Sequence, residues 1–150
     1  MKSSTTLTIK SVRAMRVFAS GIAKDIVASP KKKTATVIGL VGNLGAGKTA
    51  FTGGFLRALG VKGSVLSPTF VLMRNYALRS THYKVAYHID AYRLDHPKEL
   101  LAIGFKELIK NPNAIVLVEW ANQVKKIMPA GTKWIEIKHG QGKTERVVVH

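Results

Sequence analysis

The stretch Thr36-Val37-Ile38-Gly39-Leu40-Val41-Gly42-Asn43-Leu44-Gly45-Ala46-Gly47-Lys48-Thr49 decides the fold of this chain. Its first part, Thr36 to Val41, is short, apolar and partly β-branched, as in a buried strand. The second part matches the pattern G-x-x-x-x-G-K-[ST] at every fixed position. A helix is predicted from Lys48 to about Leu59, with Gly60 ending it. A buried strand, a glycine-rich loop and a helix in this order predict a P-loop.

The residues of this loop suit a phosphate ligand. Its glycines let the backbone turn so that several N–H groups converge, and the following helix adds the positive end of its dipole. We expect Lys48 to span the β- and γ-phosphates of a nucleotide and the Thr49 hydroxyl to bind Mg²⁺. A ligand-free glycine-rich turn is the alternative, but it gives no reason for the Lys-Thr pair. The predicted nucleotide-binding residues are Gly42, Asn43, Leu44, Gly45, Ala46, Gly47, Lys48, Thr49 and Ala50.

Two acidic residues follow predicted strands. Glu119 ends the buried run 115–118, and Asp90 ends the run 85–89. A P-loop needs a second metal-binding acid, and ligands gather beyond the carboxyl ends of parallel strands. Both acids are therefore candidates for the site, although a solvated carboxylate at a strand end is the alternative for either one. With Lys48 they form the predicted catalytic set.

The remaining pattern predicts one α/β domain over residues 1–150, with a mixed β-sheet flanked by helices in a P-loop NTPase-like arrangement. Ser11 is the expected cap of a helix that runs to about Val27. The closing hairpin, around Gly140-Gln141-Gly142, makes the sheet mixed. Beyond the P-loop unit, strands are expected at 7–9, late in 64–73, at 83–89, 114–118, 133–138 and 146–149, and a helix at 97–109.

The first 26 residues allow a second interpretation. They are rich in Ser and Thr and carry five Lys or Arg before Asp25, a composition typical of an organelle transit peptide. The predicted strand and the apolar stripe of the helix favour a part of the fold. No apolar run approaches the ~18–20 residues that a membrane-spanning helix needs. The absence of cysteine excludes a disulfide scaffold and a cysteine nucleophile, and it fits a reducing compartment.

The chain is strongly basic, with 24 Lys and Arg against 8 Asp and Glu in 150 residues. Residues 1–89 hold 14 of these basic residues and one acid, Asp25, for a charge of +13, which leaves +3 for residues 90–150. Such a surface predicts salt-dependent association with phosphate-rich partners. A solvated basic surface with no nucleic-acid contact is an equal alternative.

Four motifs occur in order: the P-loop, Ser67-Pro68-Thr69-Phe70, His88-Ile89-Asp90-Ala91-Tyr92-Arg93 and Val118-Glu119-Trp120. With them the chain resembles, from about Leu7 onward, the TsaE family (formerly YjeE), the small P-loop ATPases of bacterial tRNA threonylcarbamoyladenosine synthesis. The resemblance implies a weak Mg²⁺-dependent ATPase of the cytoplasm that binds ATP and ADP. It also implies that the protein acts with TsaB and TsaD in modifying adenosine in tRNA, which it contacts indirectly or through its basic surface.

The resemblance also implies roles for single residues. Thr49 and Glu119 would hold Mg²⁺, and Asp90 would orient the attacking water itself or act through the groups that contact it. Ser67 and Thr69 would belong to a loop that resembles a GTPase switch near the γ-phosphate. Trp120 and Arg93 match motif positions without an assigned role, and Arg93 is the nearest candidate for an arginine finger. Asn43 departs from the family, which usually has Asp there.

Two other functions remain open at this stage. One is a small-molecule kinase, for which residues 60–90 leave little room for both a lid and an acceptor-binding insertion. The other is a basic nucleic-acid-binding module with a vestigial P-loop. His88 either orients Asp90 or a neighbouring loop, or is a structural histidine, and no histidine spacing suggests zinc.

Overall fold

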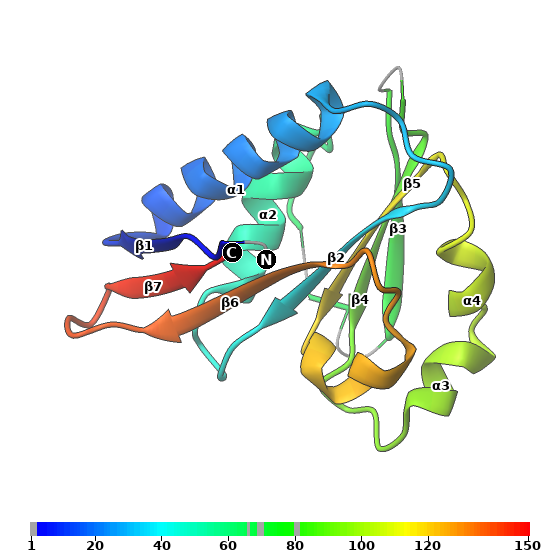
Figure 1. Ribbon diagram of the computed structural model, residues 1–150. Helices are drawn as coiled ribbons and strands as arrows, with labels where there is room; N and C mark the ends of the chain where they lie inside the picture. The colour runs from blue at the N-terminus through cyan, green and yellow to red at the C-terminus, as the bar shows by residue number, and fades with distance from the viewer. Residues whose placement is uncertain (1–2, 66, 69–70, 80–81) are drawn as a thin grey trace.

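The computed structural model describes residues 3–65, 67–68, 71–79 and 82–150 of the chain. Within them, seven strands form one sheet in the order β1-β7-β6-β2-β5-β4-β3 (Figure 1). The elements are β1 Thr6–Ile9, α1 Val12–Ala28, β2 Thr36–Val41, α2 Lys48–Ala58, β3 Met73–Ala77, β4 Val85–Asp90, α3 Pro97–Ala102, α4 Phe105–Leu108, β5 Ala114–Glu119, η1 Ala121–Ile127, β6 Lys133–His139 and β7 Arg146–Val149. The predicted mixed sheet flanked by helices is confirmed.

The centre of the sheet is parallel and its margins are antiparallel. β2 pairs in parallel with β5 and β6, and β5 pairs in parallel with β4. The register sets Asp90 opposite Glu119, and Glu119 opposite Leu40 near the end of β2. The two acids therefore meet at the sheet edge from which the P-loop leaves β2.

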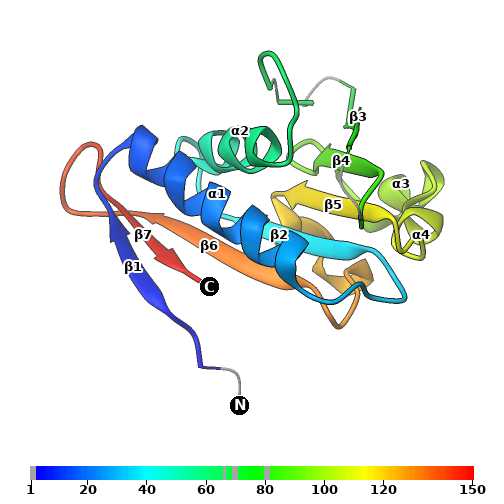
Figure 2. The same ribbon diagram turned by 90° about the horizontal axis from the view of Figure 1, so that it is seen from above.

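Successive residues of the central strands alternate between two cores, one on each face of the sheet. Ile38 and Leu117 pack on one face with α1 and α2, and Val37 and Val116 pack on the other with the α3–α4 segment and η1. Figure 2 shows α1 and α2 lying across the same face. Because both faces are covered, β5 is buried along its whole length, including Glu119 at its end.

The N-terminal segment is part of the fold, as the helix pattern predicts. Ser11 caps α1 by accepting a hydrogen bond from the Ala14 N–H at 3.0 Å. β1 pairs with β7 in antiparallel register, which places Thr8 opposite Val147. The predicted hairpin of β6 and β7 is also present. Among the described residues, no helix is both long and apolar enough to span a membrane.

Two predictions about local structure are wrong. The single helix expected over 97–109 is two short helices, because Gly104 adopts φ 90°, a left-handed conformation that interrupts the helical path. The break lets Leu100 and Phe105 both reach the same core. The strand expected late in 64–73 begins only at Met73 and continues to Ala77, where it pairs with β4.

Candidate active site

The P-loop lies directly against the neighbouring strand β6. A Cβ atom on Gly42 would lie 2.5 Å from the backbone oxygen of Ile137, so only glycine lets the chain leave β2 along this path. Gly47 caps α2 with φ 113°, which also favours glycine. The Ala46 N–H closes the turn on the Asn43 carbonyl at 3.0 Å. These contacts build the predicted anion-binding loop at the positive end of α2.

The Lys48 side chain is held within the site and is only 6% exposed. Its Nζ donates to the carbonyl oxygens of Gly42 and, at 2.9 Å, Asn43. The same ammonium lies 4.1 Å from the centroid of the Trp120 ring, within the range of a cation–π contact. Burial lowers the pKa of Lys48, while the carboxylates of Glu119 and Asp90 act in the opposite direction.

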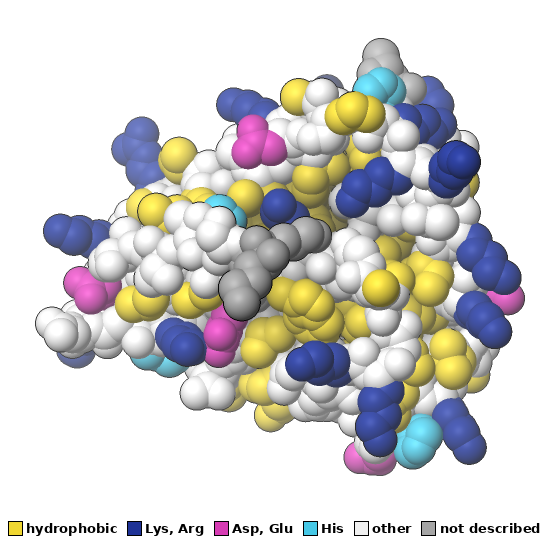
Figure 3. Space-filling model, viewed as in Figure 1, with side chains coloured by type: hydrophobic (Ala, Val, Ile, Leu, Met, Phe, Trp, Pro, Cys, Tyr) yellow, Lys and Arg dark blue, Asp and Glu magenta, His cyan; other side chains and the backbone are white. Residues whose placement is uncertain are grey.

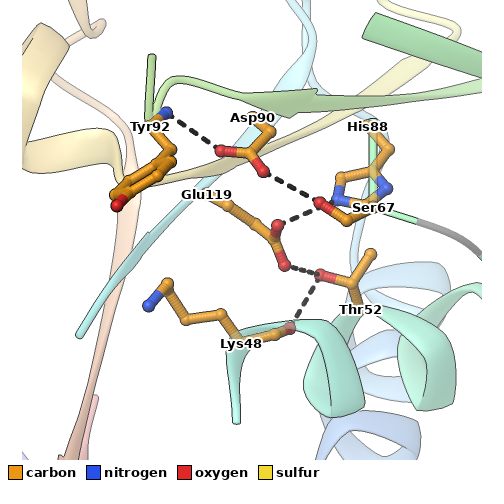
Figure 4. Close-up of polar contacts among 7 residues, drawn as sticks. All are labelled: Lys48, Thr52, Ser67, His88, Asp90, Tyr92 and Glu119. Atoms are coloured by element: carbon orange, nitrogen blue, oxygen red, sulfur yellow. Dashed lines mark hydrogen bonds and ion pairs between the residues drawn. The ribbon is translucent and has the colours of Figure 1, made fainter. Parts of the chain in front are cut away.

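Glu119 is 2% exposed and faces the P-loop helix from the end of β5. Its Oε1 accepts a hydrogen bond of 3.3 Å from the Thr52 hydroxyl of α2, which also donates to the Lys48 carbonyl. Its Oε2 lies 3.5 Å from Nε2 of His88, a fully buried residue of β4 (Figure 4). Thr52 hydrogen-bonds this carboxylate on one side, and the His88 ring lies against it on the other.

Asp90 lies beside Glu119 and is 5% exposed. One of its carboxylate oxygens accepts a hydrogen bond from the Ser67 hydroxyl, and the other accepts one from the Tyr92 N–H, both at 2.9 Å (Figure 4). The two bonds fix the plane of the carboxylate. They also connect the end of β4 to the segment that contains Ser67.

A cavity of about 340 Å³ brings these groups together. Its wall includes Leu44, Gly45, Gly47, Lys48, Thr49, Ser67, Asp90, Tyr92, Glu119 and Trp120. The structure therefore gathers the predicted catalytic residues and Thr49 in one place. Trp120 both lines the site and packs, since its ring lies 4.8 Å from the Tyr92 ring. Its backbone is left-handed, with φ 58°.

Some sequence-based expectations differ from this geometry. His88 contacts Glu119 rather than Asp90, and neither of its ring nitrogens has a hydrogen-bond partner among the described residues. Arg93 is exposed and is not one of the described residues that line the cavity. Thr69 and Phe70 of the switch-like motif lie outside the described residues. Thr52 was missed because its contact with Glu119 joins distant parts of the chain.

The oxygen groups of the cavity suit magnesium. Mg²⁺ commonly takes one or two carboxylates together with water and phosphate oxygens. Thr49, Asp90 and Glu119 all line this cavity, and the oxygen groups that they carry fit such an ion. No group of three or more His, Cys, Asp or Glu arranged for a metal occurs among the described residues.

Comparison with known proteins identifies relatives of this chain. The family described as "Threonylcarbamoyl adenosine biosynthesis protein TsaE" matches residues 9–148. The TsaE protein of Haemophilus influenzae is 35% identical over 115 residues, which are 77% of this chain and 70% of that protein. The TsaE protein of Bacillus subtilis is 37% identical over 116 residues, covering 77% and 69% of the two chains.

A solved structure is also similar along nearly the whole chain. The crystal structure of Bacillus subtilis YdiB superimposes with a TM-score of 0.77 at 28% sequence identity. The match covers 99% of this chain and 85% of YdiB. The matched residues 9–148 include the P-loop and both strand-end acids, so the chain belongs to the TsaE family.

Proposed function

We propose that this protein binds and hydrolyses ATP as a component of tRNA threonylcarbamoyladenosine biosynthesis. The observation that carries the proposal is the cavity in which Lys48 and Thr49 of the P-loop face Asp90 and Glu119 of the central strands. Membership of the TsaE family supports the pathway, since the relatives carry that role in their names.

In this proposal the phosphates of ATP or ADP lie against the P-loop, residues 42–50. The Lys48 ammonium exchanges its two loop carbonyls for phosphate oxygens, which are stronger partners because they are charged. Thr49 and Glu119 would hold Mg²⁺. When bound, that ion neutralises the phosphate charge that develops during transfer.

Hydrolysis needs an oriented water molecule and charge stabilisation rather than covalent chemistry by the protein. Both oxygens of Asp90 already accept a hydrogen bond, from Ser67 and from the Tyr92 N–H. We infer that this fixed carboxylate orients the attacking water. The described residues bring no arginine to the cavity wall, so we expect slow hydrolysis by the protein alone and stimulation by a partner.

The proposed partners are TsaB and TsaD. We also propose that the protein is a single domain and works in the cytoplasm. A basic surface supports a further contact with the phosphates of tRNA, since Lys and Arg side chains are spread over the face shown in Figure 3. Phosphate contacts of this kind weaken steeply with salt. Binding of tRNA that persists without nucleotide and without partners would instead favour a nucleic-acid-binding module with an inactive P-loop.

The test is ATP hydrolysis with and without purified TsaB and TsaD. We expect slow hydrolysis by the wild-type protein, faster hydrolysis with both partners, and loss of the stimulated rate in Glu119→Ala. Glu136→Ala is the matched control, because this acid of β6 is not part of the described cavity wall. Absence of stimulation would contradict the pathway role, and consumption of ATP only with an added metabolite hydroxyl would point to a kinase.

A further inference from the structure

Arg146, the first residue of β7, contacts the P-loop from outside the cavity. Its Nε donates to the Ala46 carbonyl at 3.0 Å, and its Nη2 donates to the Gly45 carbonyl at 3.3 Å. Its Nη1 donates to the carbonyls of Lys143 and Glu145, each at 2.9 Å. One guanidinium therefore ties two P-loop carbonyls to the β6–β7 turn.

The sheet explains why a residue so distant in sequence reaches the loop. β7 pairs with β6, which places Arg146 opposite His139, and β6 lies beside β2, from which the P-loop leaves. Gly42 lies close to the carbonyl oxygen of Ile137, which is also a residue of β6. The His139 ring adds a longer contact of 3.4 Å between Nε2 and the Leu44 carbonyl. The end of the hairpin thus forms a support for the P-loop.

These contacts to carbonyl oxygens also affect the direction of N–H groups, because a carbonyl and the following N–H belong to the same planar peptide unit. In a trans peptide the N–H points away from the carbonyl oxygen of the same unit. The carbonyls of Gly45 and Ala46 share their peptide units with the N–H groups of Ala46 and Gly47. The Ala46 N–H closes the turn on Asn43, and Gly47 is the N-cap of α2. Fixing both carbonyls therefore fixes the direction of N–H groups at the loop-to-helix junction.

A cation beside the carbonyl oxygens also has an electrostatic effect. It polarises each peptide unit, so that the N–H end becomes more positive. Arginine suits this role because its planar group presents several donors in a fixed arrangement, whereas a lysine ammonium cannot span the same four carbonyls. Both effects favour an anion on the cavity side of the loop.

We propose that Arg146 is a positioning residue for nucleotide binding, which holds the P-loop peptides in their phosphate-binding orientation without touching the nucleotide. The inference rests on the nucleotide-binding function proposed above. It assigns a role to the β6–β7 hairpin, which the P-loop pattern does not include. It also predicts an effect on the binding of nucleotide that leaves the chemical step unchanged.

The test is titration of the protein with ADP and Mg²⁺, combined with steady-state hydrolysis of ATP. We expect Arg146→Gln to bind ADP about tenfold more weakly and Arg146→Lys about threefold more weakly, since hydrogen bonds from a charged donor are lost. The KM for ATP should rise, with kcat at saturating ATP unchanged. Lys138→Gln is the matched control, because it removes one positive charge from a 58% exposed side chain of β6.

The outcomes separate the possibilities. If Arg146→Gln lowers the unfolding temperature of the nucleotide-free protein but binds ADP like the wild type, Arg146 is only structural and the proposal is overturned. A fall in kcat with KM unchanged overturns it as well. If Arg146→Gln does not fold, Arg146→Lys decides by its ADP affinity. A wild-type protein that binds no ADP contradicts the proposed function itself, whereas equal binding by wild type and variant contradicts only this inference.

Discussion

The P-loop and the wall that faces it are built on opposite principles. The P-loop is a backbone structure, in which glycine conformations and carbonyl contacts set the shape. The facing carboxylate wall, Asp90 and Glu119, depends on side chains: Ser67 and Thr52 donate hydrogen bonds to the two carboxylates, and the His88 ring lies against Glu119. We infer that the P-loop, apart from Lys48 and Thr49, tolerates changes of side chain but not an added Cβ at its tight positions. The wall should show the reverse.

The largest effect is expected in the carboxylate wall. Glu119→Gln keeps the shape of the side chain and an oxygen that can accept the Thr52 hydrogen bond, but it removes the charge proposed to hold Mg²⁺. Partner-stimulated hydrolysis should fall about 100-fold, the size of effect seen when one electrostatic group of a site is lost. The unfolding temperature should change little. Steady-state hydrolysis and thermal unfolding measure the two effects, and an active Glu119→Gln would contradict the role of the wall.

The next effect concerns the backbone of the P-loop. Gly42→Ala adds a Cβ that would lie 2.5 Å from the Ile137 carbonyl and 3.2 Å from the Ala46 Cβ, so the loop must shift. Overpacking of this kind costs about 2 kcal/mol, or roughly thirtyfold in nucleotide affinity if the loop carries the whole strain. Gly53→Ala is the control, since nothing lies within 4 Å of its Cβ position. Equal ADP affinities for the two variants would show that the close approach to β6 is unimportant.

A smaller effect, the pH dependence of ADP affinity, involves both regions. Burial lowers the pKa of Lys48, so its ammonium loses the proton at a lower pH than an ordinary lysine. ADP affinity should therefore fall in alkaline solution, as the charged form decreases about tenfold for each pH unit above that pKa. Because the Glu119 carboxylate opposes the shift, Glu119→Gln should move the fall to still lower pH. Titrations from neutral to alkaline pH test this, and Lys48→Arg should show no such fall.

The smallest effect is expected at an exposed side chain of the P-loop. Asn43 contributes its backbone carbonyl to Lys48 and to the Ala46 N–H, and its side chain is exposed. Asn43→Ala should change ADP affinity less than about twofold, as for a surface substitution without a specific contact. A large loss, measured by the same titration, would show that the loop depends on side chains as the wall does.

The same contrast explains what the sequence could predict. The P-loop is local, since its strand, glycines and Lys48-Thr49 are contiguous, and its position and chemistry follow from the pattern. Asp90 and Glu119 were predicted as strand-end acids, and the parallel register places them side by side. The α/β sheet was predictable for the same reason, because each buried strand is a short apolar run.

Contacts between distant residues were not predictable in this way. Thr52 reaches Glu119, and Arg146 reaches the P-loop, only because the sheet brings their elements together. The prediction of one helix over 97–109 was wrong because Gly104 adopts a left-handed conformation. The residues on both sides of it have a helical composition, so the sequence does not reveal the break. The local sequence pattern thus predicts which residues form the site, whereas the contacts that support them depend on tertiary packing.

The central claim is that a nucleotide binds between the P-loop and the carboxylate wall, and the most direct test is calorimetric titration of ADP with Mg²⁺ into wild type and Lys48→Ala. We expect saturable binding at one site in the wild-type protein and loss of that binding in Lys48→Ala, with both proteins folded. Equal ADP affinity in the two proteins would contradict it.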